Sequence, residues 1–309
     1  MKVHLISHTA VTVFIRLLLL ALMCENLPTF ARAQETNLNF TTIQEAADKG
    51  DAKAQYELAR CYEKGQGIPK DYVKAAQYLR QAAEQGYALA QGQLGYYYGM
   101  GLGVDKNPTE AFKWYQKAAN QGNAMAQFAM GYIYSTGKGV SNDVNQAIHW
   151  WQKAASQNLP QAQNALGQFY YQQGKTNSVK YADALIWLRK AAEQGYGPAM
   201  NDLGTIYDFG LSVKRDFAEA AKWYSLGAEQ GETMAQANLG VLYFDGRGVT
   251  NDFLKAYVLF RLSAEKGSGV GKKYLYMEFD ENKLLSPSQL VEAERMINEF
   301  HSRQAKLKP

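Results

Sequence analysis

The chain has 309 residues and a formal net charge of +4 at pH 7, with 33 Lys and Arg against 29 Asp and Glu. A nucleic-acid-binding protein would show a strongly basic stripe, so this balance argues against nucleic acid as a partner. Two cysteines and four histidines supply too few ligands for a metal site of recognisable spacing, and we expect neither a metal nor another cofactor.

Residues 1–33 have the pattern of a secretory signal peptide. Lys2 precedes the mostly apolar run Val11–Met23, and Ala31-Arg32-Ala33 forms an A-x-A cleavage site. The run is shorter than the roughly 20 residues that span a bilayer and contains Arg16, which argues against a retained anchor. We therefore predict an exported protein, periplasmic or secreted, that is cleaved after Ala33. Membrane contact would occur only through an uncleaved signal.

Residues 34–49 are predicted to form a polar leader and an N-terminal capping helix. Thr42-Ile43-Gln44-Glu45 fits the T-x-x-E capping box, which predicts a helix from Thr42 to Lys49 that ends at Gly50. This helix would cover the apolar face of the first repeat.

A five-residue motif of two small residues, two further residues that are mostly polar, and a final Gly or Asn, such as Ala82-Ala83-Glu84-Gln85-Gly86, then recurs along the chain. Its occurrences are spaced 36, 36, 36, 37, 36 and 36 residues apart. A fixed period between 20 and 50 residues is the signature of a repeat array. The motifs end at Gly50, Gly86, Gly122, Asn158, Gly195, Gly231 and Gly267. We predict six repeats at residues 50–85, 86–121, 122–157, 158–194, 195–230 and 231–266, together spanning residues 50–267.

Each repeat is predicted to contain two helices joined by a glycine-containing turn. In the second repeat, Ala90, Leu94 and Tyr98 follow helical spacing, Gly101-Leu102-Gly103 breaks the helix, and a second helix begins near Pro108. The residues that recur in every repeat are expected to form the core, because a single helix pair cannot bury them and a stack can. They are the rows at Ala90, Leu94, Tyr98, Ala111 and Trp114.

Two repeats depart from the pattern. The fourth begins with Asn158 in place of glycine and has a longer turn, 173–178, without G-x-G; the fifth turn has Ser212 in place of its second glycine. Residues 268–309 are predicted to contain a partial repeat and a C-terminal capping helix, Ser288–Gln304. Its apolar side would comprise Leu290, Ala293, Ile297 and Phe300.

The combined pattern resembles the Sel-one-like repeat (SLR) family, a relative of the tetratricopeptide repeats. Ala90…Leu94-Gly95…Tyr98…Gly101…Gly103-Val104 and Ala111…Trp114-Tyr115…Ala118-Ala119…Gly122 carry the resemblance. It implies an all-α, right-handed α/α superhelical solenoid with capping helices at both ends. It also implies an adaptor for protein complexes, with exported bacterial members that serve in envelope processes or host contacts.

The sequence offers few candidates for catalysis. After the signal peptide, Cys61 is the only cysteine, so we expect no disulfide. The other repeats have apolar residues at its position, so we expect its thiol to be buried. His149 is expected at the surface or at a groove edge. Cysteine-rich relatives have been linked to penicillin binding or hydrolysis, but their paired cysteines are absent here. We expect no enzyme and no catalytic residue, and keep a β-lactamase-like hydrolase as the less favoured alternative.

The first helices also carry a stripe of positions that vary between repeats, namely those two before, two after and five after the repeated leucine, and such a stripe is free to specify a partner. In helix-pair solenoids the first helices line the concave side, and aromatic residues are enriched at interaction hot spots. We predict that a protein or peptide binds this groove, with a peptidoglycan or other carbohydrate as the alternative ligand and ordinary packing between repeats as the alternative role. The predicted groove residues are Tyr56, Arg60, Tyr96, Phe128, Tyr132, Gln168, Tyr171, Asn201, Thr205 and Phe244.

Overall fold

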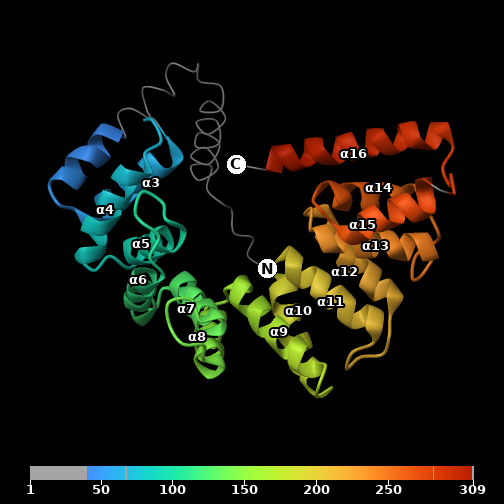
Figure 1. Cartoon of the computed structure of the whole chain (residues 1–309), viewed down its shortest axis with the longest axis horizontal. Coiled ribbons are helices and arrows are strands. Elements are labelled where there is room, and N and C mark those ends of the chain that lie inside the picture. The colour runs from blue at the N-terminus through green and yellow to red at the C-terminus, as the bar shows by residue number, and fades with distance from the viewer. Residues whose placement is uncertain (1–39, 67, 281, 308–309) are drawn as a thin grey trace, which may run out of the picture. The chain divides into compact units, whose positions relative to one another are not determined.

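The computed structural model describes residues 40–66, 68–280 and 282–307 (Figure 1). The predicted signal peptide and its cleavage site lie outside these residues. In the described part of the chain every regular element is a helix, and the helices pair consecutively, as the repeat pattern predicted. The chain forms two compact units. One comprises residues up to Ala126 with 138–141; the other comprises 127–137 with the residues from Asn142 onward.

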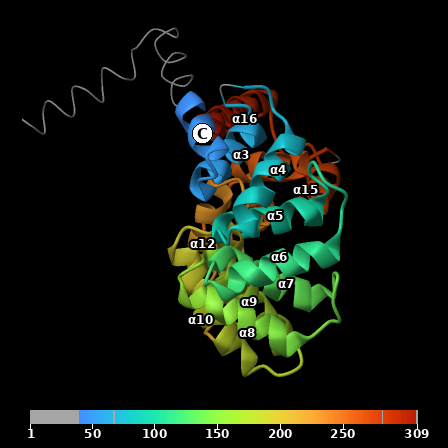
Figure 2. The same cartoon turned by 90° about the vertical axis from the view of Figure 1, so that its left-hand side faces the viewer.

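The first unit contains a short helix over residues 40–48 and two helix pairs, which lie side by side (Figure 1 and Figure 2). Residues 40 and 41 are already helical. The predicted capping box is therefore wrong, because Thr42 lies inside the helix rather than at its start. The pairs are α3 (Ala52–Lys64) with α4 (Tyr72–Glu84), and α5 (Ala88–Met100) with α6 (Pro108–Asn120).

The second unit continues the alternation and ends in a longer helix, α16, which packs against α14 (Figure 1). The first three residues of α7 are counted with the first unit. Its elements are α7 (Ala124–Thr136), α8 (Val144–Ser156), α9 (Pro160–Gly174), α10 (Lys180–Glu193), α11 (Gly197–Phe209), α12 (Phe217–Glu229), α13 (Thr233–Asp245), α14 (Phe253–Glu265), α15 (Gly269–Tyr274), the π-helix η1 (Leu275–Asp280) and α16 (Pro287–Leu307).

The repeated Ala and Leu rows form the core, as predicted, whereas most members of the rows at Tyr98 and Trp114 are half-buried and lie at its edge. The leucine row is buried throughout, with Met130 at one of its positions, and the alanines at the Ala111 position are 3% exposed or less. In the first repeat, Ala54 and Cys61 are both half-buried, unlike most members of their rows. They lie in α3, the first repeat helix, where fewer repeat neighbours are available to cover them.

Hydrogen-bonded glutamine pairs connect consecutive repeats, a feature that the repeat pattern alone does not predict. Gln91, 4% exposed, donates to the carbonyl of Ala83 at 3.0 Å and accepts from Gln121 Nε2 at 2.7 Å. Buried amides are normally hydrogen-bonded in folded proteins. Each pair of glutamines therefore provides hydrogen-bond partners for the buried amide and also fixes the end of a second helix. The same side-chain bond joins Gln85 to Gln55, Gln157 to Gln127 and Gln194 to Gln163.

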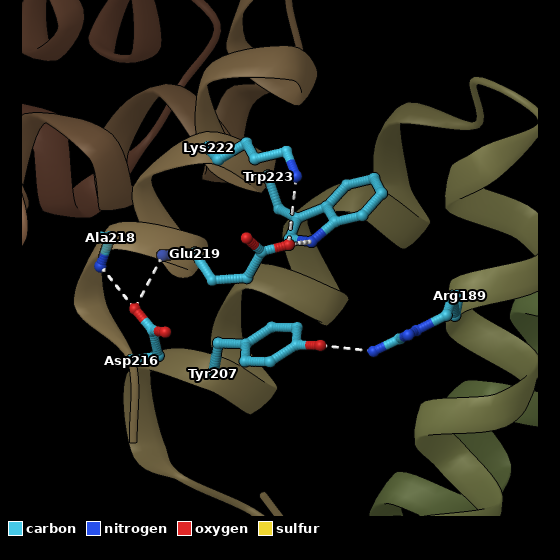
Figure 3. Close-up of polar contacts among 7 residues, drawn as sticks. All are labelled: Arg189, Tyr207, Asp216, Ala218, Glu219, Lys222 and Trp223. Carbon is cyan, nitrogen blue, oxygen red and sulfur yellow. Dashed lines mark hydrogen bonds and ion pairs between the residues drawn. The ribbon is translucent and has the colours of Figure 1, made fainter. Parts of the chain in front are cut away.

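The polar atoms of the repeated Tyr and Trp positions form hydrogen bonds between helices and within one helix (Figure 3). Tyr207 of α11 accepts a hydrogen bond from Arg189 of α10. Trp223 Nε1 donates to Glu219 Oε1 at 2.8 Å on α12, whose N-terminus is capped by the Asp216 carboxylate. Tyr207 and Trp223 are both half-buried, and the polar atom of each has a partner. Trp150 is an exception, because its buried Nε1 has no partner.

The two irregular turns keep the backbone conformation of the glycines they replace. Asn158 has φ 60° and Ser212 has φ 59°. At the turn of the sixth repeat, a Cβ on Gly248 would lie 2.3 Å from the carbonyl carbon of Phe217, so only glycine fits. Ser212 instead donates from its hydroxyl to the carbonyl of Ser178, in the longer fourth turn, at 3.3 Å. The longer turn and the missing glycine are therefore parts of one local arrangement.

The C-terminal cap is built on an aromatic cluster. Phe244 contacts Phe253, Tyr274 and Phe279 with centroid distances of 5.4, 5.5 and 5.9 Å. Helix α16 begins after Ser286, which forms a capping box with Gln289. Ala293, Ile297 and Phe300 are buried as predicted, but Leu290 is 40% exposed.

Candidate partner-binding site

A hollow of about 680 Å³ lies in the second unit against the first helices of three consecutive repeats, α7, α9 and α11. Its walls include Phe128 and Tyr132 of α7, Gln168 and Tyr171 of α9, and Thr205 of α11. All five belong to the variable stripe predicted from the sequence. The repeated leucines are buried in the core, so these helices present their variable positions to the hollow. We call this hollow the first cavity.

Asp202 is the one charged side chain among the residues that line the first cavity. Its carboxylate accepts from Gln168 Nε2 at 2.8 Å and from Asn201 Nδ2 at 3.2 Å. Burial raises the pKa of Asp202, the two amide hydrogen bonds oppose this rise, and the nearby Glu232 adds to it. Within the described part of the chain, Asp202 forms no ion pair. The cavity therefore contains a negative charge that neutral groups alone offset.

Three buried polar atoms at the first cavity have no hydrogen-bond partner. They are Trp151 Nε1, Asn164 Oδ1 and Gln161 Oε1. Trp151 is 8% exposed and Asn164 is 6% exposed, so neither side chain is well hydrated by bulk solvent. The Trp151 indole packs on the backbone of Gly131, where a Cβ would come within 2.4 Å of Nε1. Buried polar atoms normally have partners, so these three leave hydrogen-bonding capacity unused in the wall of the cavity.

The aromatic walls combine exposed and fixed rings. Tyr132 is 47% exposed, whereas Tyr171 packs edge-on against Tyr181 at 5.4 Å. Burial raises the pKa of the Tyr171 and Tyr196 hydroxyls, so both remain protonated at neutral pH. Rigid rings with a polar edge are the side chains that contribute most to protein interfaces.

A second cavity, of about 400 Å³, is lined by Asn201, Thr205 and Asp208 of the stripe and by Arg215 and Arg247. Asp208 lies 3.9 Å from an Arg247 nitrogen. Thr205 lines both cavities, and its hydroxyl donates to the carbonyl of Asn201 at 3.0 Å. The stripe residues of α11 therefore contribute to two adjoining hollows of different charge.

The remaining predicted groove residues are placed differently. Tyr56, Arg60 and Tyr96 belong to the first unit, where Arg60 pairs with Glu57 at 3.3 Å and Tyr96 is 43% exposed. Phe244 lines neither cavity and belongs to the aromatic cluster beneath the C-terminal cap. This packing explains the aromatic residue at position 244 without any need for a binding partner.

Sequence reasoning did not select Trp151, Gln161, Tyr196 or Asp202. Trp151 occupies a repeated bulky position, and such positions were assigned to the core. Asp202 directly follows the stripe residue Asn201, and its position varies between repeats, which is the signal that could have identified it. Its pairing with Gln168 depends on contact between α9 and α11. A single sequence does not state that contact.

The structure also shows the surroundings of the residues considered for catalysis, Cys61 and His149, and bears on metal binding and membrane insertion. Burial raises the pKa of the half-buried Cys61 thiol, and His149 is exposed beside Trp150. Among the described residues, no three or more His, Cys, Asp and Glu side chains are grouped to hold a metal ion. No helix in that part of the chain combines the length and apolar character needed to cross a bilayer.

Comparison with known proteins decides the family. The sequence model of the Sel1 repeat matches six consecutive segments, at residues 52–87, 88–123, 124–159, 160–196, 197–232 and 233–268. The chain belongs to the Sel1 repeat family. Sel1 repeat proteins are generally helical scaffolds for protein interactions and are generally not enzymes. A comparison with curated proteins finds no match.

Two solved structures support the assignment. One is c5321, a protective antigen present in uropathogenic Escherichia coli strains that displays an SLR fold, at 33% identity and a TM-score of 0.79. The alignment covers 89% of this chain and 60% of that one, so this Sel1 repeat chain spans less than two thirds of the length of that relative. The other is a Sel1 repeat protein from Oxalobacter formigenes, at 33% identity and a TM-score of 0.66, covering 81% and 95%.

Proposed function

We propose that this Sel1 repeat protein is an exported, non-enzymatic scaffold that binds a protein partner through a peptide segment in the first cavity. The observation that carries the proposal is that the repeated and the variable residues of α7, α9 and α11 have different surroundings. Their repeated side chains form the core, while their variable side chains, including the exposed Tyr132 ring and the buried, unpaired Asn164 Oδ1, surround a hollow.

The chemistry of the cavity suits a peptide. Main-chain groups of an extended peptide supply both hydrogen-bond donors and acceptors, and Trp151 Nε1 and Asn164 Oδ1 are one of each. Exposed aromatic rings such as Tyr132 supply apolar contact area with little loss of side-chain entropy. Export is supported by the pattern of residues 1–33, and N-terminal sequencing of the secreted protein should begin at Gln34.

Selection of peptides tests the proposal. Random dodecapeptides displayed on phage are selected on the protein, and the enriched peptides are synthesised with a fluorescent label. We expect Tyr132→Ala and Phe128→Ala to weaken binding in fluorescence polarisation by about tenfold or more each, as truncation of hot-spot rings does. Tyr276→Ala, at a ring that is 63% exposed and lines neither cavity, is the control and should leave binding unchanged.

Failure to enrich any peptide, or equal binding by the two cavity variants and the wild-type protein, would refute peptide binding at this site. A parallel titration with muropeptides, followed by tryptophan fluorescence, covers the carbohydrate alternative. Saturable binding of muropeptides that Tyr132→Ala abolishes, without any enriched peptide, would replace the proposed ligand with a glycan. Hydrolysis of nitrocefin by the purified protein would contradict the non-enzymatic assignment.

A further inference from the structure

The charge of the first cavity restricts the partner's chemistry. The Asp202 carboxylate is held by two neutral amides, from Gln168 and Asn201, and no cation lies among the residues that line the cavity. Asp202 is half-buried, and a carboxylate partly removed from water is stabilised by a neighbouring cation. The direction of its pKa, raised by burial, agrees with this geometry. A positively charged group entering the cavity would provide the missing compensation.

Two of the three unpaired atoms at the cavity are acceptors. Gln161 Oε1 and Asn164 Oδ1 lie one turn apart on α9, and Gln168, one turn beyond Asn164, holds Asp202. Acceptors therefore follow one face of the helix toward the carboxylate. A ligand rich in donors fits them best, and a guanidinium has five N–H donors in a planar arrangement and no acceptor.

The walls are also suited to a guanidinium. Tyr132, Tyr171 and Tyr196 line the same hollow as Asp202, and guanidinium groups stack on aromatic faces with a gain that increases when water is excluded. The adjoining second cavity is lined by Arg215 and Arg247 and by Asp208, which lies 3.9 Å from Arg247. Its two cations outnumber its one carboxylate, so it attracts a basic side chain less than the first cavity does, and the two hollows favour one register of a bound peptide.

We infer that the first cavity is an arginine-specificity pocket. It receives an arginine side chain of the partner segment, whose guanidinium binds Asp202 and Asn164 between the tyrosine rings. This inference rests on the proposed function, because it specifies the residue that the peptide-binding site selects.

The peptides enriched on the protein supply the test. We expect them to share an arginine, and replacement of that arginine by citrulline, which keeps the shape and removes the charge, should weaken binding at least about tenfold. Lysine at this position should give an intermediate loss, because an ammonium keeps the charge but has fewer donors. On the protein, Asp202→Asn should abolish the preference for arginine over citrulline. The matched control Asp183→Asn removes a carboxylate that pairs with Lys180 outside both cavities and should keep that preference.

The outcomes separate the two proposals. Enriched peptides that bind through Tyr132 but contain no shared arginine, or that bind equally well with citrulline, overturn the arginine pocket and leave peptide binding intact. Absence of any enriched peptide overturns both. If Asp202→Asn does not fold, the comparison of arginine and citrulline peptides on the wild-type protein still decides the question.

Discussion

Gly248→Ala should destabilise the second unit strongly, whereas Ser212→Ala at the equivalent turn should not. Gly248 has φ +70°, and a Cβ there would lie 2.3 Å from the carbonyl carbon of Phe217 and 2.6 Å from the amide nitrogen of Ala218. Ordinary contact begins near 3.4 Å, so the backbone must retreat by about 1 Å. The left-handed conformation adds about 1–2 kcal/mol for an alanine, and overpacking adds about 1–3 kcal/mol.

The expected loss for Gly248→Ala is therefore about 2–5 kcal/mol in the free energy of unfolding. Ser212 already has a side chain at φ 59°, and Ser212→Ala removes one exposed hydrogen bond to Ser178, for a loss of less than about 1 kcal/mol. Urea denaturation followed by far-UV circular dichroism measures both. Because repeat arrays can unfold in stages, the midpoint and slope of each transition are compared. Equal midpoints for the two variants would show that the close turn contact does not stabilise the stack.

Three further predictions concern the glutamine pairs and the cavity. Lys266→Gln should raise the unfolding free energy by about 0.5–1.5 kcal/mol, since the buried Gln236 Oε1 lacks the partner that glutamine provides in other repeats; an unchanged thermal midpoint would contradict this. Gln121→Leu should lower stability by about 1–3 kcal/mol by leaving Gln91 Oε1 unpaired, and adding Gln91→Met should restore part of the loss, as measured in a double-mutant cycle. Because burial raises the pKa of Asp202, the folded chain binds this proton more tightly than the unfolded chain. Wild-type stability relative to Asp202→Asn should therefore be greatest below the unfolded pKa and should decline as the pH rises through the folded pKa; a constant difference from pH 3 to pH 8 would refute the cause assigned to the shift.

The sequence was sufficient to predict the repeat architecture because the same pattern of residues occurs in every repeat. Each core position occurs six times, so Leu58, Leu94 and Leu203 could be assigned to the core without contacts between them being known. Capping was harder to predict, since Thr42 has a suitable local sequence but lies within a helix that is already formed at residue 40. Local patterns state a preference, and packing decides the boundary.

The candidate site could be predicted only in part. Periodicity identified the stripe that contains Phe128, Tyr132 and Tyr171, because variable positions on a helix face can be found by aligning the repeats. It did not identify Asp202 or the unpaired Nε1 of Trp151. Their roles depend on which neighbours approach from other helices and which polar atoms remain unpaired, and these are properties of the packed structure.

Site-specific photo-cross-linking tests the central claim most directly. A photoreactive phenylalanine derivative is introduced at Tyr132, or at the exposed control position Tyr276, and each protein is illuminated with the same labelled peptide enriched on the wild-type protein. Peptide binding in the first cavity predicts a covalent adduct from position 132 that excess unlabelled peptide suppresses, and no such adduct from position 276. Cross-linking at position 276 with none at position 132 would contradict the claim that the variable face of α7, α9 and α11 binds the partner.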